Sequence, residues 1–512
     1  MVRRISLSVC LVALIGFVAL PAFAAVQNVK ISGDINVSGV ARNNLDLEKT
    51  RSLEVIAAGD SVDKQEDFFS IARVRVDADL TDNVSTSVRL LNERNWNGDS
   101  TTATEANRNI GMAASAGSDT SSDQGNLNID IASITLREFM APALTLTVGR
   151  QELRFGNGWI VGDPDTNGVA LASELAEGDL SSRKAFDALR ARLDYNPLVL
   201  DLIYAKVAER STVRNNDTDL YGVNAAYELS AQTTLEGFYF AKKRGVMDAL
   251  AATNIDAGTA TDFLGTTATQ PVKSASDVVN TVGARVVNKS VKNLTLDGQV
   301  AYQFGTYNPV LDPNARYITD ADKAETSPRS AWGTEVVAVY DLKDVSAVSK
   351  WEPSLTGAYI YLSGANRDKT GNKAYKGWDS MFEDQTFGHL INAVMGFSNA
   401  HILGASLKAK PATDLTAQLD YVTGWFAKKY VEGRPAILSG VSTAQQFTMG
   451  NKANFGHEFD ATLTYDYTED VQMSLLGGIF LPSKAINGNG AIYPYRQKAI
   501  ATELIGSMKV TF

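Results

Sequence analysis

The chain has 512 residues, and its 58 acidic residues outnumber its 48 basic residues, which gives a formal net charge of −10. This acidity argues against a nucleic-acid partner, because nucleic acids are bound mainly through lysine and arginine. The single cysteine excludes a disulfide framework, and a mean hydropathy of −0.11 excludes a bundle of apolar membrane helices.

The first 24 residues have the three parts of a secretory signal peptide. Arg3 and Arg4 precede an apolar run over residues 5–20, Pro21 ends that run, and residues 22–24 read Ala-Phe-Ala, a cleavage pattern. The run is short for a membrane anchor, which needs roughly 20 apolar residues. Cys10 lies upstream of the cleavage site, which argues against a lipoprotein. We therefore expect a cleaved Sec-type signal peptide (1–24) and one exported domain (25–512).

Alternation of apolar and polar residues, the pattern of a half-buried β-strand, recurs along the rest of the chain. In residues 294–304, for example, Leu, Leu, Gly, Val, Tyr and Phe share one face, and Thr, Asp, Gln, Ala and Gln share the other. We count about eighteen such strands, most of them about ten or more residues long, as a tilted strand needs to cross a bilayer. They are expected to begin near residues 28, 66, 83, 127, 143, 185, 198, 217, 232, 277, 293, 331, 353, 398, 414, 455, 471 and 498.

The connections between these strands alternate between short and long. Short turns are expected at residues 81–82, 141–142, 196–197, 230–231, 290–291, 411–412 and 468–469, with a longer one at 341–351. Long polar loops are expected at 95–126, 155–184, 244–276, 305–330, 363–398 and 427–454. A soluble β-sandwich has no reason to keep this asymmetry, whereas bacterial outer-membrane barrels show it. The sequence therefore predicts an all-β fold, a transmembrane antiparallel β-barrel of about 18 strands with short periplasmic turns and long extracellular loops.

The last strand supports the same interpretation. Seven residues, from Ile500 to the terminal Phe512, alternate onto one face of it, and this ending resembles the signal that the barrel-assembly machinery reads. Tyrosines and tryptophans near strand ends are expected to form interfacial girdles facing outer-membrane lipid. These are Tyr204, Tyr239, Tyr340, Trp351, Tyr421, Trp425 and Tyr467.

Two neighbouring motifs carry a family resemblance. Residues 148–162 read VGRQELRFGNGWIVG, and residues 183–190 read RKAFDALR. The pair resembles the alginate-export family of outer-membrane porins, whose members have a Gly-Arg-Gln-Glu-Leu strand end, a Gly-rich loop and a Phe-Asp-x-x-Arg strand. Residues 219–223, 405–411 and 456–460 also fit. The resemblance implies an eighteen-stranded barrel that passes a hydrophilic polymer or solute passively, with Arg150, Asp187 and Arg190 lining the pore near its narrow zone.

Charged residues of both signs are expected to face the lumen. Arginine suits carboxylate-bearing cargo, because its planar donor fork pairs with carboxylates in a bidentate manner. Alternation places Arg73, Arg75, Arg89, Arg137, Arg190, Arg192 and Arg285 on the inner face. It also places there Asp77, Asp79, Asp194, Asp201, Glu228, Glu236, Asp297, Glu335, Asp420, Glu458, Asp460 and Glu503. These arginines therefore either meet cargo or pair with carboxylates across the strands, and the mixed lumen leaves alginate itself undecided.

A calcium-loop pattern follows the first motif. Asp163, Asp165, Asn167 and Glu174 stand at the spacing at which oxygen ligands wrap a hard cation, although the flanking helices of an EF-hand are missing. The alternative is an Asx-rich turn in an exposed loop. Beyond this possible structural calcium we expect no cofactor, because passive diffusion needs none.

The leading interpretation is a channel for hydrophilic solutes, among them an anionic polysaccharide, and a general or otherwise solute-specific porin is the alternative. An outer-membrane enzyme would need a base, and His389, His401 and His457 lack a Ser or Asp partner at a recognisable spacing. A third interpretation is an adhesive barrel plugged by a long loop such as residues 155–184. At about eighteen strands a barrel is wide enough for an aqueous channel unless something fills it.

Overall fold

The computed structural model describes most of the chain. The described residues are 28–45, 47–49, 64–96, 127–165, 178–208, 217–245, 260–261, 267–268, 276–308, 326–365, 374–385, 387–430, 432, 435–436, 447–486 and 497–512. The predicted signal peptide, residues 1–24, lies outside them.

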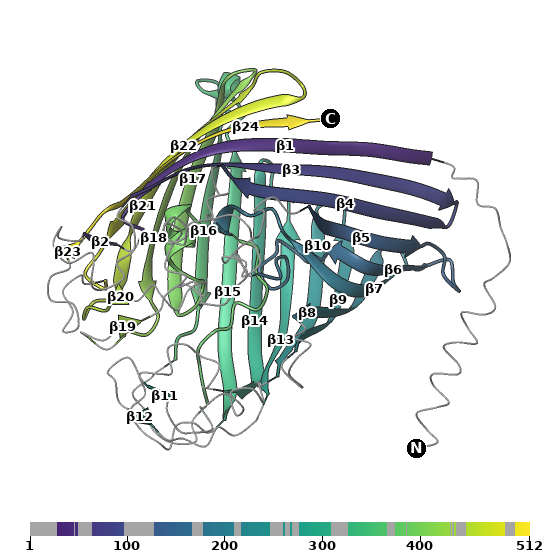
Figure 1. The fold of residues 1–512 in the computed structure, drawn as a ribbon, viewed down its shortest axis with the longest axis horizontal. Coiled ribbons are helices and arrows are strands. Elements are labelled where there is room, and N and C mark those ends of the chain that lie inside the picture. Colours follow the sequence, from purple (N-terminus) through teal and green to yellow (C-terminus); the bar gives the residue numbers. More distant parts are fainter. Residues whose placement is uncertain are drawn as a thin grey trace.

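Eighteen strands form one closed antiparallel sheet, in which each strand pairs with its neighbours in the chain (Figure 1). The strands are β1 (Asn28–Asn43), β3 (Lys64–Thr81), β4 (Val84–Asn95), β5 (Asn128–Leu136), β6 (Leu144–Glu152), β7 (Ala185–Asp194), β8 (Leu198–Ala208), β9 (Thr218–Ser230), β10 (Thr233–Arg244), β13 (Asp277–Asn288), β14 (Leu294–Tyr307), β15 (Ser327–Asp341), β16 (Ser354–Leu362), β17 (Ala400–Ala412), β18 (Leu415–Phe426), β21 (Asn454–Asp466), β22 (Val471–Pro482) and β24 (Ala501–Thr511).

Closure of the ring depends on the first and last of these strands. β1 pairs with β24 in an antiparallel register that runs from Asp34↔Thr511 to Asn43↔Thr502. Closure leaves no edge strand with unpaired backbone groups, which a sheet inside a membrane cannot tolerate. The prediction of an 18-strand barrel is confirmed, and the largest shift in a strand start is at β15, which begins at residue 327 instead of 331.

Smaller elements lie outside the ring. They are β2 (Glu48–Lys49) paired with β23 (Gln497–Lys498), β11 (Ala260–Thr261) paired with β12 (Thr267–Ala268), β19 (Pro435–Ala436) paired with β20 (Phe447–Thr448), the 3-10 turns η1 (Gly178–Leu180) and η5 (Ser349–Trp351), and the helix α4 (Leu390–Val394). No helix in the described part of the chain is both long and apolar enough to span a membrane.

The two faces of the barrel wall differ as alternation predicts. On β3, Phe68, Val74 and Val76 are exposed on the outside, whereas Arg73 and Arg75 point inward and pair with carboxylates. On β24, Ile500 just before the strand, Leu504 and Met508 are likewise exposed on the outer face. The outer face of a membrane barrel contacts lipid. Exposed apolar side chains, which would be unfavourable in water, are therefore expected on it.

Aromatic side chains gather on the outer face near both rims. The ring of Tyr204 lies beside that of Tyr221, with centroids 5.1 Å apart and planes tilted by 39°, toward the long-loop rim. At the short-turn rim, Tyr340, Trp351 and Tyr467 are exposed. Such belts lie at the level of the lipid headgroups, where an apolar ring with a polar tip is favoured.

Candidate functional site: the lumen and its inner loops

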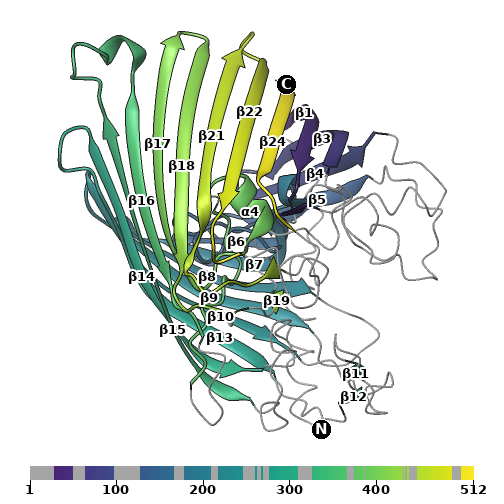
Figure 2. The ribbon, with the colours of Figure 1, turned by 90° about the vertical axis from the view of Figure 1, so that its left-hand side faces the viewer.

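Two connections fold into the barrel instead of outward. We call residues 153–165, after β6, inner loop 1, and residues 374–385 with 387–399, after β16, inner loop 2. Inner loop 2 contains α4, which lies inside the curved wall and contacts β22 and β24 (Figure 2). The two loops join directly, because the backbone of Val161 bridges that of Phe382 in parallel. Together they narrow the lumen.

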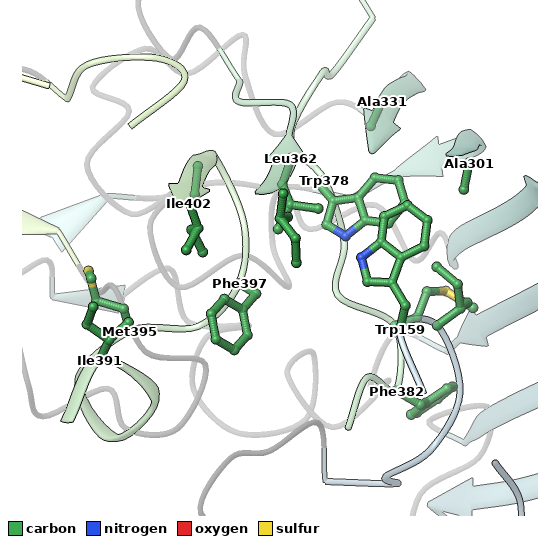
Figure 3. Packing of buried hydrophobic residues seen from close by; sticks show 14 of the residues in the cluster. Trp159, Ala301, Ala331, Leu362, Trp378, Phe382, Ile391, Met395, Phe397 and Ile402 are labelled. Carbon is green, nitrogen blue, oxygen red and sulfur yellow. The ribbon is translucent and has the colours of Figure 1, made fainter. Parts of the chain in front are cut away.

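The two inner loops share an apolar core with the barrel wall. Trp159 of inner loop 1 stacks on Trp378 of inner loop 2, with centroids 5.3 Å apart and planes 13° apart (Figure 3). Lumen-facing Ala331 and Leu362 of the wall belong to the same buried cluster. Trp159 is only 1% exposed, so the stack is excluded from water and holds both loops in the lumen by burial of apolar area.

Ion pairs attach inner loop 2 to the wall. The Lys242 ammonium on β10 pairs with Asp379, and the backbone N–H of Met381 donates to Asp379 Oδ1 at 2.8 Å. Burial alone would raise the pKa of Asp379, but the nearby charges of Lys242 and Arg329 outweigh it and lower this pKa to about 2. Asp379 is therefore a permanent anion that holds the loop against the wall.

A hydrogen-bonded group of side chains joins both inner loops to β15. Glu335 accepts from Asn157 Nδ2 and from Gln385 Nε2, each at 2.8 Å, and also from the side-chain amide of Gln299. Three hydrogen bonds to one buried carboxylate favour a single arrangement of the groups that form them.

Glu383 is buried in inner loop 2, and among the described residues no side-chain hydrogen bond to it compensates for this burial. Burial, together with the charges of Glu335 and Asp163, raises the pKa of Glu383 well above its ordinary value of 4.5. Folding of the loop into the lumen favours protonated Glu383. The free energy that holds the loop there is therefore largest below about pH 4.5 and decreases as the pH rises toward the raised pKa.

We expect the inner loops to open more readily at pH 8 than at pH 5. Glu383→Gln, which is neutral at every pH, should remove this dependence and keep the conductance low at both values. Single-channel recording at the two pH values measures it. The control is Glu352→Gln, at an exposed carboxylate in the rim turn between η5 and β16. Equal pH dependence in wild type and Glu383→Gln would refute the assignment.

Arginines line the lumen wall, and each of the following pairs with a carboxylate. Arg73 Nε donates to Asp34 (2.9 Å), Arg75 Nε to Asp77 (2.8 Å), Arg89 Nη2 to Glu152 (2.5 Å), Arg190 Nε to Asp201 (2.7 Å), and Arg285 Nη1 to Glu236 (2.6 Å). Arg192 lies on the same face of β7 as Arg190, opposite Asp201 in register. The five paired arginines of this wall are therefore neutralised by neighbouring carboxylates.

Two of these arginines adjoin inner loop 1. The Arg190 guanidinium lies 5.4 Å from the centroid of the Phe155 ring. A Cβ at Gly156 would come within 3.4 Å of Arg285 Nη1. Arg190 and Arg285 are therefore lumen cations placed at the narrowed level of the barrel.

Arg150 and Asp187 lie elsewhere than expected. They pair with each other across β6 and β7 at 3.1 Å, on the face that also carries the exposed side chains of Val148 and Leu189. Successive residues of a strand alternate between faces, so this pair points out of the barrel while Arg190 points in. The expectation that Arg150 and Asp187 line the pore is corrected accordingly.

Gly149 in the same motif has a backbone reason to be glycine. Its φ is +117°, and a Cβ there would overlap the carbonyl oxygen of Ala132 on β5. We expect Gly149→Ala to destabilise the barrel by about 1–3 kcal/mol, the usual cost of a strained backbone position. Urea unfolding in detergent measures this. Gly298→Ala is the control, because a Cβ at Gly298 meets nothing within 4 Å, and an equal loss there would contradict the explanation.

The calcium-loop residues are only partly described. The Lys184 ammonium pairs with Asp163, and the Asp165 N–H donates to Asp163 Oδ1 at 2.8 Å. Burial, with the charge of Asp163, raises the pKa of Asp165. Asn167 and Glu174 lie outside the described residues, and within the described ranges no three His, Cys, Asp or Glu side chains are grouped as a metal site. The calcium loop stays a prediction. Its first carboxylate, Asp163, is paired with Lys184, and a bound cation would have to displace this ammonium group.

The histidines lie beside tyrosines. His401 Nδ1 is 2.9 Å from the Tyr359 hydroxyl, and His457 Nδ1 is 2.9 Å from the Tyr421 hydroxyl. Both pairs point outward, on the faces of Leu403 and of Phe459. No histidine ring is hydrogen-bonded to a carboxylate among the residues that the structure describes, so the geometry that would favour a catalytic base does not occur there.

Sequence reasoning described residues 363–398 as a polar loop and missed inner loop 2. Its apolar residues are buried in the lumen, namely Trp378, Met381, Phe382, Leu390, Ile391 and Val394. Their density within a single connection was the signal available in the sequence, because an extracellular loop has no reason to carry them.

Comparison with known proteins agrees with this architecture. The alginate export family model matches residues 36–495. Three Pseudomonas aeruginosa crystal structures are similar. OccK8 (OprE) is 10% identical, with 95% of this chain and 99% of that chain covered and a TM-score of 0.50. OpdQ is 12% identical (96% and 99%, TM-score 0.49), and the outer membrane protein opdK is 9% identical (94% and 99%, TM-score 0.46).

These structural likenesses concern the fold alone, and no match was found among curated protein sequences. The family match, by contrast, extends from β1 to the residues just before β23, and so includes the inner loops and the arginine wall. The chain belongs to the alginate export family and is an outer-membrane β-barrel channel.

Proposed function

We propose that this channel passes an anionic, carboxylate-bearing polysaccharide of the alginate type across the outer membrane. Membership of the family supports the class of cargo. The observation that carries the proposal is the arginine wall, where Arg73, Arg75, Arg190 and Arg285 face the lumen from β3, β7 and β13. Guanidinium groups match carboxylates in shape and charge.

The wall carboxylates that pair with these arginines favour movement of the polysaccharide through the channel, because they weaken its binding to each arginine. A free arginine inside a narrow bore would bind a polyuronate tightly, whereas conduction requires binding weak enough to release the cargo. An arginine paired with its own wall can exchange that partner for a cargo carboxylate and then return to it. Because the wall pair must open before the cargo carboxylate binds, the cargo is held more weakly than it would be by an unpaired arginine.

A second function is favoured by the opposite wall. Asp420, Glu458, Asp460 and Glu503 point into the lumen from β18, β21 and β24, and a wall of this sign attracts cations and repels polyuronates. A channel for small hydrophilic solutes of either charge would suit such a mixed lumen.

Ion current through the purified protein in planar bilayers separates the two functions. We expect oligouronates to block the current and neutral oligosaccharides of equal length to leave it unchanged. Arg285→Gln should weaken the block several-fold, and the control Arg137→Gln, at an exposed side chain near the short-turn rim, should not. Equal block by neutral and acidic oligomers, or none by either, would leave the small-solute channel.

A further inference from the structure

The acidic wall contains a group of carboxylates that lies beneath inner loop 2. Asp420 and Asp460 face each other in register on β18 and β21, and Glu458 and Glu503 are their neighbours on the lumen side. Within the described part of the chain, one basic side chain comes within ion-pair distance of these four residues, namely Arg42, at 3.2 Å from Glu503 Oε2. Arg42 is shared with Asp179, so the group retains an excess of negative charge.

Glu458 has a clear structural role in this group. Its two carboxylate oxygens accept the backbone N–H groups of Leu390 and Ile391, each at 2.7 Å, at the start of α4. Glu458 thereby fastens inner loop 2 over the acidic wall. The loop covers the remaining carboxylates and removes them from water.

Asp460 and Glu503 are the members that remain uncompensated. Asp460 is 3% exposed and Glu503 is 5% exposed. By hydrogen-bond geometry, neither oxygen of Asp460 and not Oε1 of Glu503 has a partner among the described residues. His389, just before α4, lies near both carboxylates, and its backbone N–H and the Glu458 carboxyl are the polar groups nearest to Asp460. A buried carboxylate costs several kcal/mol unless it is paired, hydrogen-bonded or bound to a metal. Two such groups side by side are stabilised when a cation or a proton lies between them.

The geometry directs these oxygens to one place. A Cβ at Gly478 would lie 2.7 Å from Asp460 Oδ1 and 3.0 Å from Glu503 Oε1. The two oxygens therefore converge on the space that this glycine leaves open on the lumen side of β22. The adjacent Gly477 faces outward, and a Cβ there would meet nothing within 4 Å.

We propose that Asp460 and Glu503 bind a hard divalent cation above Gly478, beneath α4. Carboxylate oxygens are the preferred ligands of Ca²⁺ and Mg²⁺, and water completes the shell of a site with few protein ligands. The bound ion neutralises the acidic wall beside the conduction path. It also stabilises the contact between α4 and the wall. Glu458, which accepts the backbone N–H groups at the start of that helix, is two residues from Asp460 on the same face of β21. This site is separate from the calcium loop at Asp163.

The test is calcium binding by the full-length mature protein in detergent micelles, after removal of metal with a chelator. Calorimetric titration with CaCl₂ should show a site with a Kd of about 10⁻⁴–10⁻³ M, as in weak extracellular calcium sites, and this site should persist in Asp163→Asn. Asp460→Asn should weaken binding at least tenfold. Gly478→Ala should do the same while keeping both carboxylates, because its methyl group fills the space between them.

Three controls make this result specific. Gly477→Ala should bind calcium like the wild type, since its methyl group enters open space on the outer face. Asp466→Asn, at the short-turn rim, and Asp163→Asn, in the calcium loop, should also leave this binding unchanged. Absence of calcium binding to the wild type, or undiminished binding in both Asp460→Asn and Gly478→Ala, would overturn the proposal. It would then follow that a shared proton compensates the two carboxylates, and oligouronate block, which tests the cargo, would be unaffected.

Discussion

Replacing Trp159 and Trp378 by alanine is expected to raise the single-channel conductance several-fold. The two rings stack in the lumen, 1% and 3% exposed, and deleting a buried tryptophan side chain costs about 3–5 kcal/mol. The lost free energy destabilises the contact that holds the two inner loops in the lumen, so the loops are expected to open the pore more often. The ring of eighteen strands has its own backbone pairing and is expected to persist.

Planar-bilayer recording of the double variant measures this effect, and resistance of the barrel to unfolding in detergent shows that the wall is intact. The control is Trp332→Ala, because Trp332 is a tryptophan of the same barrel on its lipid-facing side, 52% exposed. An unchanged conductance in the double variant would mean that the aromatic stack does not restrict the pore.

The second large effect is expected at Arg329 on β15. Its guanidinium is buried, donates to Asp277 at 3.1 Å, and lies 5.3 Å from the ring centroid of Tyr375 in inner loop 2. Arg329→Met leaves Asp277 as an uncompensated buried charge and removes the stacking surface for Tyr375. Removing one partner of a buried ion pair costs about 3–5 kcal/mol.

Urea unfolding in detergent should therefore show a marked loss of stability for Arg329→Met, together with more frequent opening of the channel. Arg137→Met provides the comparison, because Arg137 is exposed and lies 3.9 Å from Asp79, and a surface pair contributes about 0–1 kcal/mol. If the two variants lost equal stability, Arg329 would not have the anchoring role assigned to it.

The barrel wall could be predicted because the orientation of each side chain in a strand depends only on residues close to it in the sequence. A strand alternates its faces every residue, so the periodicity of β3 and β24 revealed which side chains meet lipid. Turn residues and loop length then supplied strand boundaries, and β5, β6 and β22 begin within one residue of their expected positions. The lumen carboxylates named from alternation, such as Asp201 and Glu335, do point inward.

The interior could not be derived in the same way because its contacts are far apart in the chain. Trp159 and Trp378 are separated by eight of the eighteen barrel strands, and nothing local indicates that they stack. Lys184 reaches Asp163 only because inner loop 1 folds back into the barrel. For Arg150, alternation alone would have given the correct outward orientation, because Val148 faces lipid and Arg150, two residues later on the same strand, shares that face. The resemblance to a family had suggested the pore instead.

The central claim is that alternate residues of each strand face lipid and a water-filled bore. Adjacent positions on β3 test it most directly, because the mature chain has no native cysteine if residues 1–24 are removed as expected. Arg75→Cys and Val76→Cys are each exposed to a charged, membrane-impermeant thiol reagent during bilayer recording. The account predicts an immediate change in current for Arg75→Cys and none for Val76→Cys. Equal responses at both positions, or a response at Val76→Cys alone, would contradict it.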